Sequence, residues 1–471
     1  MTSAPPRSRL LIPLIVACAF FMENFDSTVI ATALPVMAHD LGESPLRLSL
    51  AITSYLLSLA VFIPLSGWAA DRYGARRVFR SAIVLFTVGS VLCGVSQNML
   101  ELVGARVLQG IGGAMMVPVG RLVLLRNVPK SELVAAMAYV TIPALMAPVF
   151  GPPIGGFIAT YSSWRWIFFI NVPISIVGFW LVTKYIAETR AQETQTLDLR
   201  GWMLIGLGLA GLIFGFENLG KGVLPNAAVL AMFGTGALLV TLYVLYARRK
   251  THPILDLSLL RLPTFGAATW GGSLFRIGTG ASTLLLPLMF QLGFGMTPLG
   301  SGLLTFATAA GALLMKTAAA PLVRRYGFRR LLLGNALICG LLLAGCGLFR
   351  ADTPHALILG FLLVTGFFRS LQFTCFGAMS FSDVSEARMS QATSLSGTAQ
   401  QLSLSIGVGV SAQLLHLGME VRRESVLSAL DFNAAFFAVG LVMASSALIF
   451  LRLRPDAGSS VSGHGASPAT S

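Results

Sequence analysis

The chain has 471 residues, of which 55% are hydrophobic and only 11% are charged. Soluble domains carry about 25% charged residues, so this composition excludes a soluble protein. The formal net charge of +14 would indicate nucleic-acid binding in a soluble domain. In a membrane protein, however, basic residues gather in short cytoplasmic loops and face anionic lipid, so we expect a lipid bilayer and no nucleic acid as partner.

Long apolar segments follow one another along the whole chain. A helix needs about 20 residues to cross the hydrocarbon core. Fourteen such segments are present: 10–37, 46–70, 79–96, 99–125, 132–161, 164–186, 201–218, 224–247, 263–291, 297–321, 330–349, 355–381, 388–416 and 431–452. The sequence therefore predicts an all-α membrane protein with fourteen transmembrane (TM) helices. The tail 455–471 is rich in Ser, Gly and Ala and is expected to be disordered.

Two acidic residues, Glu23 and Asp26, lie in the middle of the first segment. They are the only carboxylates that we place deep inside any span. A charge at membrane depth costs several kcal/mol unless it is paired, hydrated or protonated, so it usually marks an ion or substrate path. The spacing of three puts both side chains on one helix face. A protonatable pair in the first span predicts proton coupling.

The distribution of Lys and Arg predicts the orientation of the chain. With both termini in the cytoplasm, most of the basic residues fall in cytoplasmic segments, as topology requires. The first span is too long for a signal-peptide core, so we expect an uncleaved first helix. The chain is therefore expected to cross the membrane many times and to have both termini inside.

Two patterns recur in the second half of the chain. Asp71–Arg77 is matched by Arg324–Arg330, and the pair Arg106 and Gln109 is matched by the pair Arg369 and Gln372. Duplicated six-helix bundles explain both matches, and the substrate site is then expected between them. The predicted units are an N-terminal bundle (1–190), a linker with two extra TM helices (191–260), a C-terminal bundle (261–454) and the tail (455–471).

The loop after the second span combines one acid with several bases. We expect Gly67 to let helices approach, Gly74 to permit a tight turn, and Asp71 to cap a helix end or to pair with an arginine. Such charges can latch one conformation and release it in another. The alternative is a positively charged loop that serves topology alone. The residues of this conformational motif are Gly67, Asp71, Arg72, Gly74, Arg76 and Arg77.

These motifs together resemble those of the major facilitator superfamily, in its fourteen-helix drug:proton antiporter branch. The segment 67–77 resembles motif A of that family, 102–113 resembles motif B, and 147–156 resembles motif C, the antiporter signature. The segment 24–35 resembles the first-helix motif of the branch. The resemblance implies the major facilitator fold, made of two six-helix bundles plus two inserted helices. It extends over the whole chain.

The resemblance also implies roles for individual residues. Asp26 corresponds to a proton-carrying or substrate-facing acid, and Arg106 to a base that influences the proton site. A set in the fifth span is implied to shape that helix for exchange: Gly151, Pro152, Gly155 and Gly156. Prolines remove backbone donors and glycines allow close packing and bending, although ordinary small-residue packing is the alternative.

Two departures from the family pattern matter. Arg324 stands where Asp71 stands in the first half, so we expect the cytoplasmic latch to be asymmetric. Glu23 is a second acid where one would satisfy the motif, which leaves open whether Glu23 or Asp26 titrates.

Five basic residues lie inside predicted spans: Arg106, Arg121, Arg276, Lys316 and Arg369. In the register of the repeat, Glu23 corresponds to Arg276, so the halves are expected to set an acid against a base across the cavity. A cavity with more bases than acids suits an anionic substrate, such as a carboxylate metabolite or a metal-binding chelator. The alternative is that these arginines only pair with acids and helix ends. Candidate substrate-binding residues are Arg276, Arg369, Gln109, Gln372 and Asn24.

Other function classes find no support in the sequence. The five cysteines have no C-x-x-C neighbour, so we expect no metal site. A glycine pattern at 206–211 fits a dinucleotide fingerprint, but it lies inside an apolar span with no strand before it. We therefore expect no cofactor and no enzymatic activity.

The sequence thus predicts a monomeric, proton-coupled antiporter that exports small molecules by alternating access, with protons and a small-molecule substrate as partners. The first, fourth, ninth and twelfth spans should flank its cavity, and the two inserted spans should form a peripheral hairpin. Two other functions stay open: a non-transporting membrane sensor or scaffold with a transporter-like body, and a proton symporter for uptake.

Overall fold

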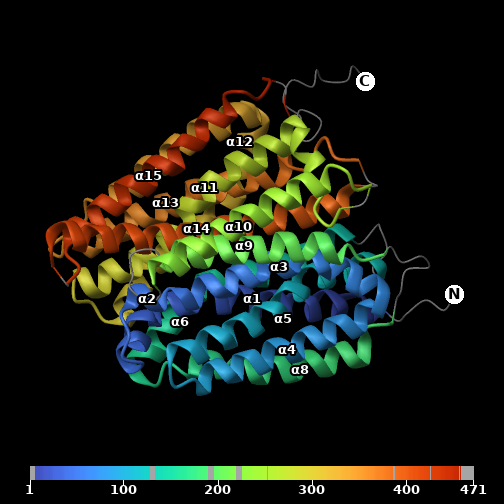
Figure 1. Ribbon diagram of the computed structural model, residues 1–471, viewed down its shortest axis with the longest axis horizontal. Helices are drawn as coiled ribbons and strands as arrows, with labels where there is room; N and C mark the ends of the chain where they lie inside the picture. Colours follow the sequence, from blue (N-terminus) through green and yellow to red (C-terminus); the bar gives the residue numbers. More distant parts are fainter. Residues whose placement is uncertain are drawn as a thin grey trace.

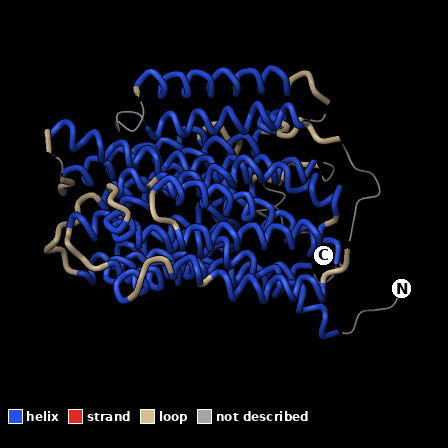
Figure 2. The backbone as a smooth tube through the Cα atoms, turned by 60° about the horizontal axis from the view of Figure 1, so that its bottom comes forward, coloured by secondary structure: helices blue, strands red, loops and turns tan. Residues whose placement is uncertain are grey.

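The computed structural model describes residues 6–127, 133–188, 196–218, 225–251, 253–385, 388–424, 426–455 and 457. Within these ranges the chain contains helices and no strand, and the loops gather at the two ends of the helical bundle (Figure 2). The disorder expected for 455–471 falls almost wholly outside the described residues.

Three groups of helices follow one another along the chain. The N-terminal half contains α1 (Pro6–Asp40), α2 (Pro45–Leu48), α3 (Leu50–Tyr73), α4 (Ala75–Val95), α5 (Met99–Asn127), α6 (Leu133–Tyr161), α7 (Trp166–Phe169) and α8 (Asn171–Tyr185). The inserted pair is α9 (Leu199–Asn218) and α10 (Asn226–Ala247). The C-terminal half contains η2 (Leu257–Arg261), α11 (Pro263–Leu288), the π-helix η3 (Met289–Gly293), α12 (Pro298–Cys346), α13 (His355–Met379), α14 (Met389–Arg422) and α15 (Ala429–Phe450).

The number of membrane-crossing segments agrees with the sequence prediction. Among the described residues, 13 segments are long and apolar enough to cross a membrane. The 29-residue helix α6 is a fourteenth, although its first side chains are not described. The start of α1 and the end of α15 lie on the same side of the bundle (Figure 1). The prediction of an all-α membrane protein is therefore confirmed.

The tenth and eleventh predicted spans are joined in one helical run, α12, instead of being separated by a loop. The run is interrupted at Gly327, whose backbone has φ 71° and ψ 163°. Gly74, the matching residue of the first repeat, has φ 96° and ψ 137° at the junction of α3 and α4. Only glycine adopts such positive φ values without strain. The sequence repeat thus corresponds to a repeated backbone turn.

Small residues bring the helices of each half into close contact. A Cβ atom on Gly112 of α5 would lie 2.5 Å from the backbone nitrogen of Phe86 on α4. One on Gly89 of α4 would lie 2.6 Å from the Cα atom of Gln109 on α5. Without hydrophobic segregation inside lipid, such close backbone packing is what holds transmembrane helices together. The two halves meet along α6 with α12 and along α3 with α14.

The inserted pair is only partly peripheral. Helix α10 is mostly exposed, as expected for a hairpin at the rim. Helix α9 instead covers the seam between α3 and α14 (Figure 1). Trp202 of α9 donates to the carbonyl of Val61 on α3 at 2.9 Å, and Gln413 of α14 donates to the carbonyl of Phe216 on α9 at 2.8 Å. One helix therefore contacts both halves.

A further buried carboxylate, which the sequence did not single out, lies near the end of α9. Glu217 is only 1% exposed and lies against Gly409 of α14. Because Glu217 is the second-to-last residue of that helix, Glu23 and Asp26 stay the only carboxylates deep inside a described span. The unit boundaries at 190/191 and 260/261 stay predictions, and the first of them falls outside the described residues.

Candidate functional site

Asp26, at mid-depth of α1, is fully buried and surrounded by donors from three other residues. Its Oδ2 lies 2.5 Å from Nη1 of Arg106, with both side chains 0% exposed. Its Oδ1 accepts from Gln109 Nε2 at 2.8 Å and from Asn171 Nδ2 at 3.3 Å. A buried carboxylate needs such donors, because an uncompensated charge at this depth is costly. Asp26, Arg106 and Gln109 therefore come together as expected.

The guanidinium of Arg106 has its own set of contacts. Its Nε donates to the carbonyl of Ala51 on α3 at 3.0 Å, and Nη1 also donates to Gln109 Oε1 at 2.7 Å. Its Cζ lies 4.1 Å from the ring centroid of Tyr55. A desolvated cation over an aromatic ring gains about 2 kcal/mol. Four helices, α1, α3, α5 and α8, thus meet at one ion pair.

Asn171 and Tyr55 were missed by the sequence reasoning. Asn171 begins α8 and also donates to Ser90 Oγ of α4 at 3.0 Å, and Ser90 donates to the carbonyl of Phe168 at 2.9 Å. The sequence did contain an indication of Asn171: it is a lone amide inside an apolar span, and a buried polar side chain requires hydrogen-bond partners. Tyr55 carried no comparable signal, since tyrosines are common in spans.

Glu23 differs sharply from Asp26 in its surroundings. It is 8% exposed, and its carboxylate accepts from Asn24 Nδ2 at 3.2 Å. No lysine or arginine among the described residues lies within ion-pair distance of it, while Asn24 itself also donates to the carbonyl of Phe20 at 2.8 Å. Of the two acids, Glu23 is therefore the one that makes no close ion pair among the described residues, although Arg121 of α5 interacts with it electrostatically over a longer distance.

The C-terminal half repeats the amides of this network without its acid. Gln372 Oε1 accepts from Asn335 Nδ2 at 2.6 Å, and Gln372 Nε2 donates to the carbonyl of Leu332 at 3.1 Å. In the register of the repeat, Thr279 stands where Asp26 stands in the first half. Arg369, the counterpart of Arg106, makes no ion pair within the described part of the chain and lines a cavity instead. The repeat is therefore electrostatically asymmetric.

Arg276 lies among aromatic rings. It is 6% exposed, its Cζ lies 5.2 Å from the ring centroid of Phe376 and 5.5 Å from that of Phe373, and its Nε makes no hydrogen bond. Glu23 and Arg276, which correspond in the repeat, do not form an ion pair. Glu23 is instead hydrogen-bonded to Asn24, and Arg276 lies against Phe373 and Phe376.

A cavity of about 190 Å³ lies between the two halves. Helices α1, α6, α11, α12 and α13 contribute its walls. Its polar lining consists of hydroxyl groups and one cation: Thr28, Thr32, Ser282, Thr283, Thr305, Thr308 and Arg369. Of the expected site residues, only Arg369 and Pro152 line it. The prediction for the flanking spans is correct for the first, ninth and twelfth and wrong for the fourth, whose place is taken by the fifth and tenth.

The motif on α6 makes contacts with both halves. A Cβ on Gly155 would lie 2.6 Å from the carbonyl oxygen of Val29 on α1, and one on Gly151 would overlap Thr28. Gly156 faces the other way, and its Cβ would overlap the carbonyl of Pro298 at the start of α12. The close packing expected of these glycines is thus present, on α1 for two of them and across the halves for the third.

The loop at Gly74 contacts its own half of the protein. Arg76 donates to the carbonyl of Thr183 on α8, and Arg77 Nε lies 3.6 Å from Glu188 Oε2. Asp71 and Arg72 occupy the last turn of α3. The tight turn expected at Gly74 is confirmed by its positive φ. Gly67, by contrast, has open space around it, so the expected close helix approach there is wrong.

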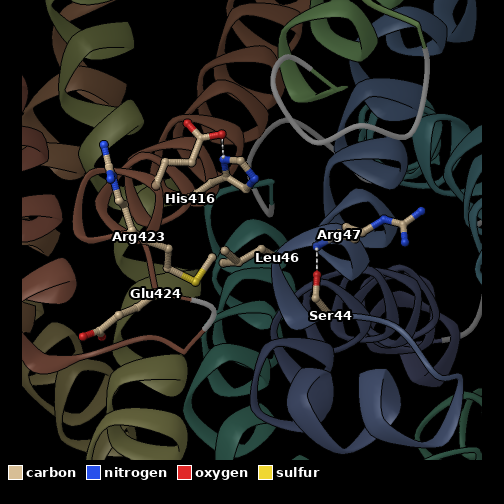
Figure 3. A pocket seen from close by; sticks show the side chains of 8 residues that line it. Ser44, Leu46, Arg47, His416, Arg423 and Glu424 are labelled. Carbon is tan, nitrogen blue, oxygen red and sulfur yellow. Dashed lines mark hydrogen bonds and ion pairs between the residues drawn. The ribbon is translucent and has the colours of Figure 1, made fainter.

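A second, larger pocket of about 490 Å³ lies where α2 meets the end of α14 (Figure 3). Two of its side chains have partners close by: Arg47 lies 2.8 Å from Glu43, and His416 lies 3.8 Å from Glu420. None of the expected site residues lines it, and it is separate from the cavity at Arg369.

Comparison with known proteins agrees with this geometry. The Major Facilitator Superfamily model matches residues 16–407 and again 268–470. The putative multidrug resistance protein MdtD of Pectobacterium atrosepticum is 37% identical, covering 94% of this chain and 95% of that protein. The protein of the same name from Salmonella typhimurium is 38% identical, covering 97% of each chain.

Two solved structures share the fold at low sequence identity. A D-xylose–proton symporter superposes with a TM-score of 0.68 at 15% identity, covering 95% of this chain and 98% of that one. A POT family transporter in complex with a thioalcohol-conjugated peptide gives 0.70 at 17% identity, covering 93% and 95%. With the family match over most of its length, the chain belongs to the major facilitator superfamily and is a multi-pass inner-membrane transporter, not an enzyme.

Proposed function

We propose that this transporter is a proton-coupled antiporter that exports small molecules by alternating access. The observation that carries the proposal is the buried pair of acids on α1. Asp26 is held by Arg106, Gln109 and Asn171, whereas the hydrogen bond to Glu23 comes from the amide of Asn24. Asp26 is thus paired with a buried cation, and Glu23 makes no close ion pair among the described residues, so we assign the first exchanging proton to Glu23.

The difference between the acids suggests an order of events. In the conformation described, Glu23 binds a proton first, because Asp26 would have to give up its ion pair. Asp26 exchanges a proton only when Arg106 moves away from it. A substrate that favours the deprotonated state must, by linkage, be released when the protons bind, which gives exchange in opposite directions.

The cavity supports an organic anion as substrate. Its one charged group is Arg369, which makes no ion pair among the described residues and is surrounded by hydroxyl groups from α1, α11 and α12. A guanidinium binds carboxylates in a two-pronged geometry, and hydroxyls add hydrogen bonds. Carboxylates, free or holding a metal ion, fit this lining better than lipophilic cations. The drugs implied by the names of the MdtD relatives are the alternative substrates.

The test is substrate-induced proton release from the purified transporter in weakly buffered solution. A panel of organic acids, free and as metal chelates, is compared with a panel of lipophilic cations. We expect release with the acids, loss of release in Glu23→Gln, and loss of substrate binding in Arg369→Ala. Arg452→Ala, which removes an exposed cation beyond α15, is the matched control and should behave as wild type.

Three results would contradict antiport, and a fourth would reject the anion site alone. Normal proton release by both Glu23→Gln and Asp26→Asn would remove the acids from the mechanism. Transport without any proton movement would favour a different kind of carrier, and binding without transport would favour a sensor. Equal response to acids and cations, unchanged in Arg369→Ala, would reject the anion site while leaving antiport intact.

A further inference from the structure

The two halves are joined at one end of the bundle by hydrogen bonds that the functional site does not use. In the orientation predicted from the basic residues, this is the outer end, where α1 and α11 finish and α12 begins. Gln291 Nε2 of η3 donates to the carbonyl of Thr32 on α1 at 2.9 Å. The backbone N–H of Leu299 on α12 donates to Thr160 Oγ1 on α6 at 3.1 Å. Each bond runs from the C-terminal half to the N-terminal half.

The local backbone makes both bonds possible. Pro35 in α1 has no N–H, so the carbonyl of Ala31 loses its helical donor, and the proline ring crowds the helix one residue before Thr32. Gln291 lies in a π-helical turn directly after Pro287, and such turns are found mostly at functional sites. The proline of each half thus lies beside the bond that joins them.

The second bond is a helix cap supplied by the other half. The first N–H groups of a helix have no partner within it. At the start of α12, Thr297 accepts from the N–H of Gly300 at 3.1 Å, while the N–H of Leu299 is taken by Thr160. When the halves separate, water can accept from the N–H of Leu299 in place of Thr160. The bond therefore stabilises the closed state without making the open state strongly unfavourable.

The bonds lie at the outer wall of the cavity. Thr32 and Pro287 both line it, and Gln291 is 9% exposed just beyond them. Release to the outside requires that α1 separate from α11 and that α6 separate from α12. Every contact between these helices must therefore break in each cycle.

We propose that Gln291 and Thr160 form an outer latch that sets the balance between the closed and open states of the outer end. This inference rests on the proposed function, because a latch has meaning only in alternating access. Glycine contacts at the same place, such as Gly302 against Pro152, make the closed state close-packed. The two hydrogen bonds also fix how the helices of the two halves are aligned in the closed state.

The experiment measures the distance between the outer ends directly. Spin labels are attached at Gln97→Cys and Ala351→Cys, which are exposed positions in the outer loops of the two halves. Cys18, the only native cysteine that is not buried, is replaced by Ser. Distance distributions are recorded in lipid nanodiscs without substrate, for wild type, Gln291→Leu and Thr160→Val.

We expect each variant to raise the ratio of the long-distance to the short-distance state by about fivefold, as the loss of one neutral hydrogen bond implies. Asn335→Leu is the matched control: it removes an amide that also donates to a helix carbonyl, but between α12 and α13 within the C-terminal half. It should leave the distribution unchanged. If Gln291→Leu does not fold, Gln291→Asn gives the same test, because the shorter amide does not reach Thr32.

A wild-type distribution in both folded latch variants would overturn the proposal, and so would an equal shift in Asn335→Leu. The outcome is separate from that of the proton-release experiment. A latch that opens in a protein without proton release would refute the antiport mechanism alone, and proton release with an unaltered distribution would refute the latch alone.

Discussion

The ion pair between Asp26 and Arg106 gives the sharpest quantitative prediction. Both side chains are 0% exposed, and the pair is the meeting point of four helices. Removing one partner of a buried ion pair leaves the other uncompensated and costs about 3–5 kcal/mol. We therefore expect both Asp26→Asn and Arg106→Gln to lower the free energy of unfolding by about this amount.

The double variant distinguishes an ion pair from two independent contributions. In Asp26→Asn with Arg106→Gln, neutral amides replace both charges, and Gln109 and Asn171 can still hydrogen-bond to them. Contacting residues in one network show interaction energies of 0.5–3 kcal/mol, and we expect the upper part of this range, about 2–3 kcal/mol. The double variant should thus be more stable than the sum of the two losses predicts.

The assay is unfolding of the purified protein in detergent, followed by tryptophan fluorescence, with all four proteins measured under the same conditions. Wild type should have the highest thermal midpoint, and the loss in the double variant should be about 2–3 kcal/mol smaller than the sum of the two single losses. Strictly additive losses in the double variant would refute the reasoning, because the charges would then not compensate each other. A stable Asp26→Asn protein would show that Arg106 is satisfied by the Ala51 carbonyl and Gln109 alone.

Three further outcomes follow from individual contacts. Asn171→Leu should lose about 1.5–3 kcal/mol of stability, because its amide bonds to a charged carboxylate; a loss no larger than that of Asn335→Leu, whose partners are neutral, would argue against a charged Asp26. Gly366→Ala should abolish folded protein, because its Cβ would overlap the Thr308 carbonyl. Gly377→Ala on the same helix has open space and should give the wild-type amount of folded protein in size-exclusion chromatography; equal yields of the two variants would refute the close packing at Gly366. Burial acts to raise the pKa of Asp256, but the hydrogen bonds from Ser258 and Arg388 outweigh it and lower that pKa. Its ionised form therefore stabilises the fold above the unfolded pKa of about 3.9, so Asp256→Asn should lower the melting temperature slightly at pH 7, with a difference that disappears below about pH 4; an unchanged difference at low pH would contradict the assignment.

The number, order and type of the helices could be predicted from the sequence, because the bilayer imposes length and apolarity on each one separately. The family motifs and the repeat also lie within short segments. Gly74 and Gly327 illustrate this: a positive φ is a local requirement that only glycine meets without strain, so the repeated turn was visible in the sequence.

What only the tertiary structure decided is which polar groups meet. Glu23 and Asp26 look alike in the sequence, one helical turn apart. Their difference comes from Arg106, Gln109 and Asn171, which arrive from two other helices and reach only Asp26.

The same holds for the C-terminal half and for the inserted pair. Arg369 faces the cavity because Thr279 replaces an acid there, and Glu217 is buried because α9 packs on α14. Membrane insertion is decided residue by residue along one helix, and the sequence alone determined it. The pairing of charges depends on how helices distant in the chain pack together, and no single segment carries that information.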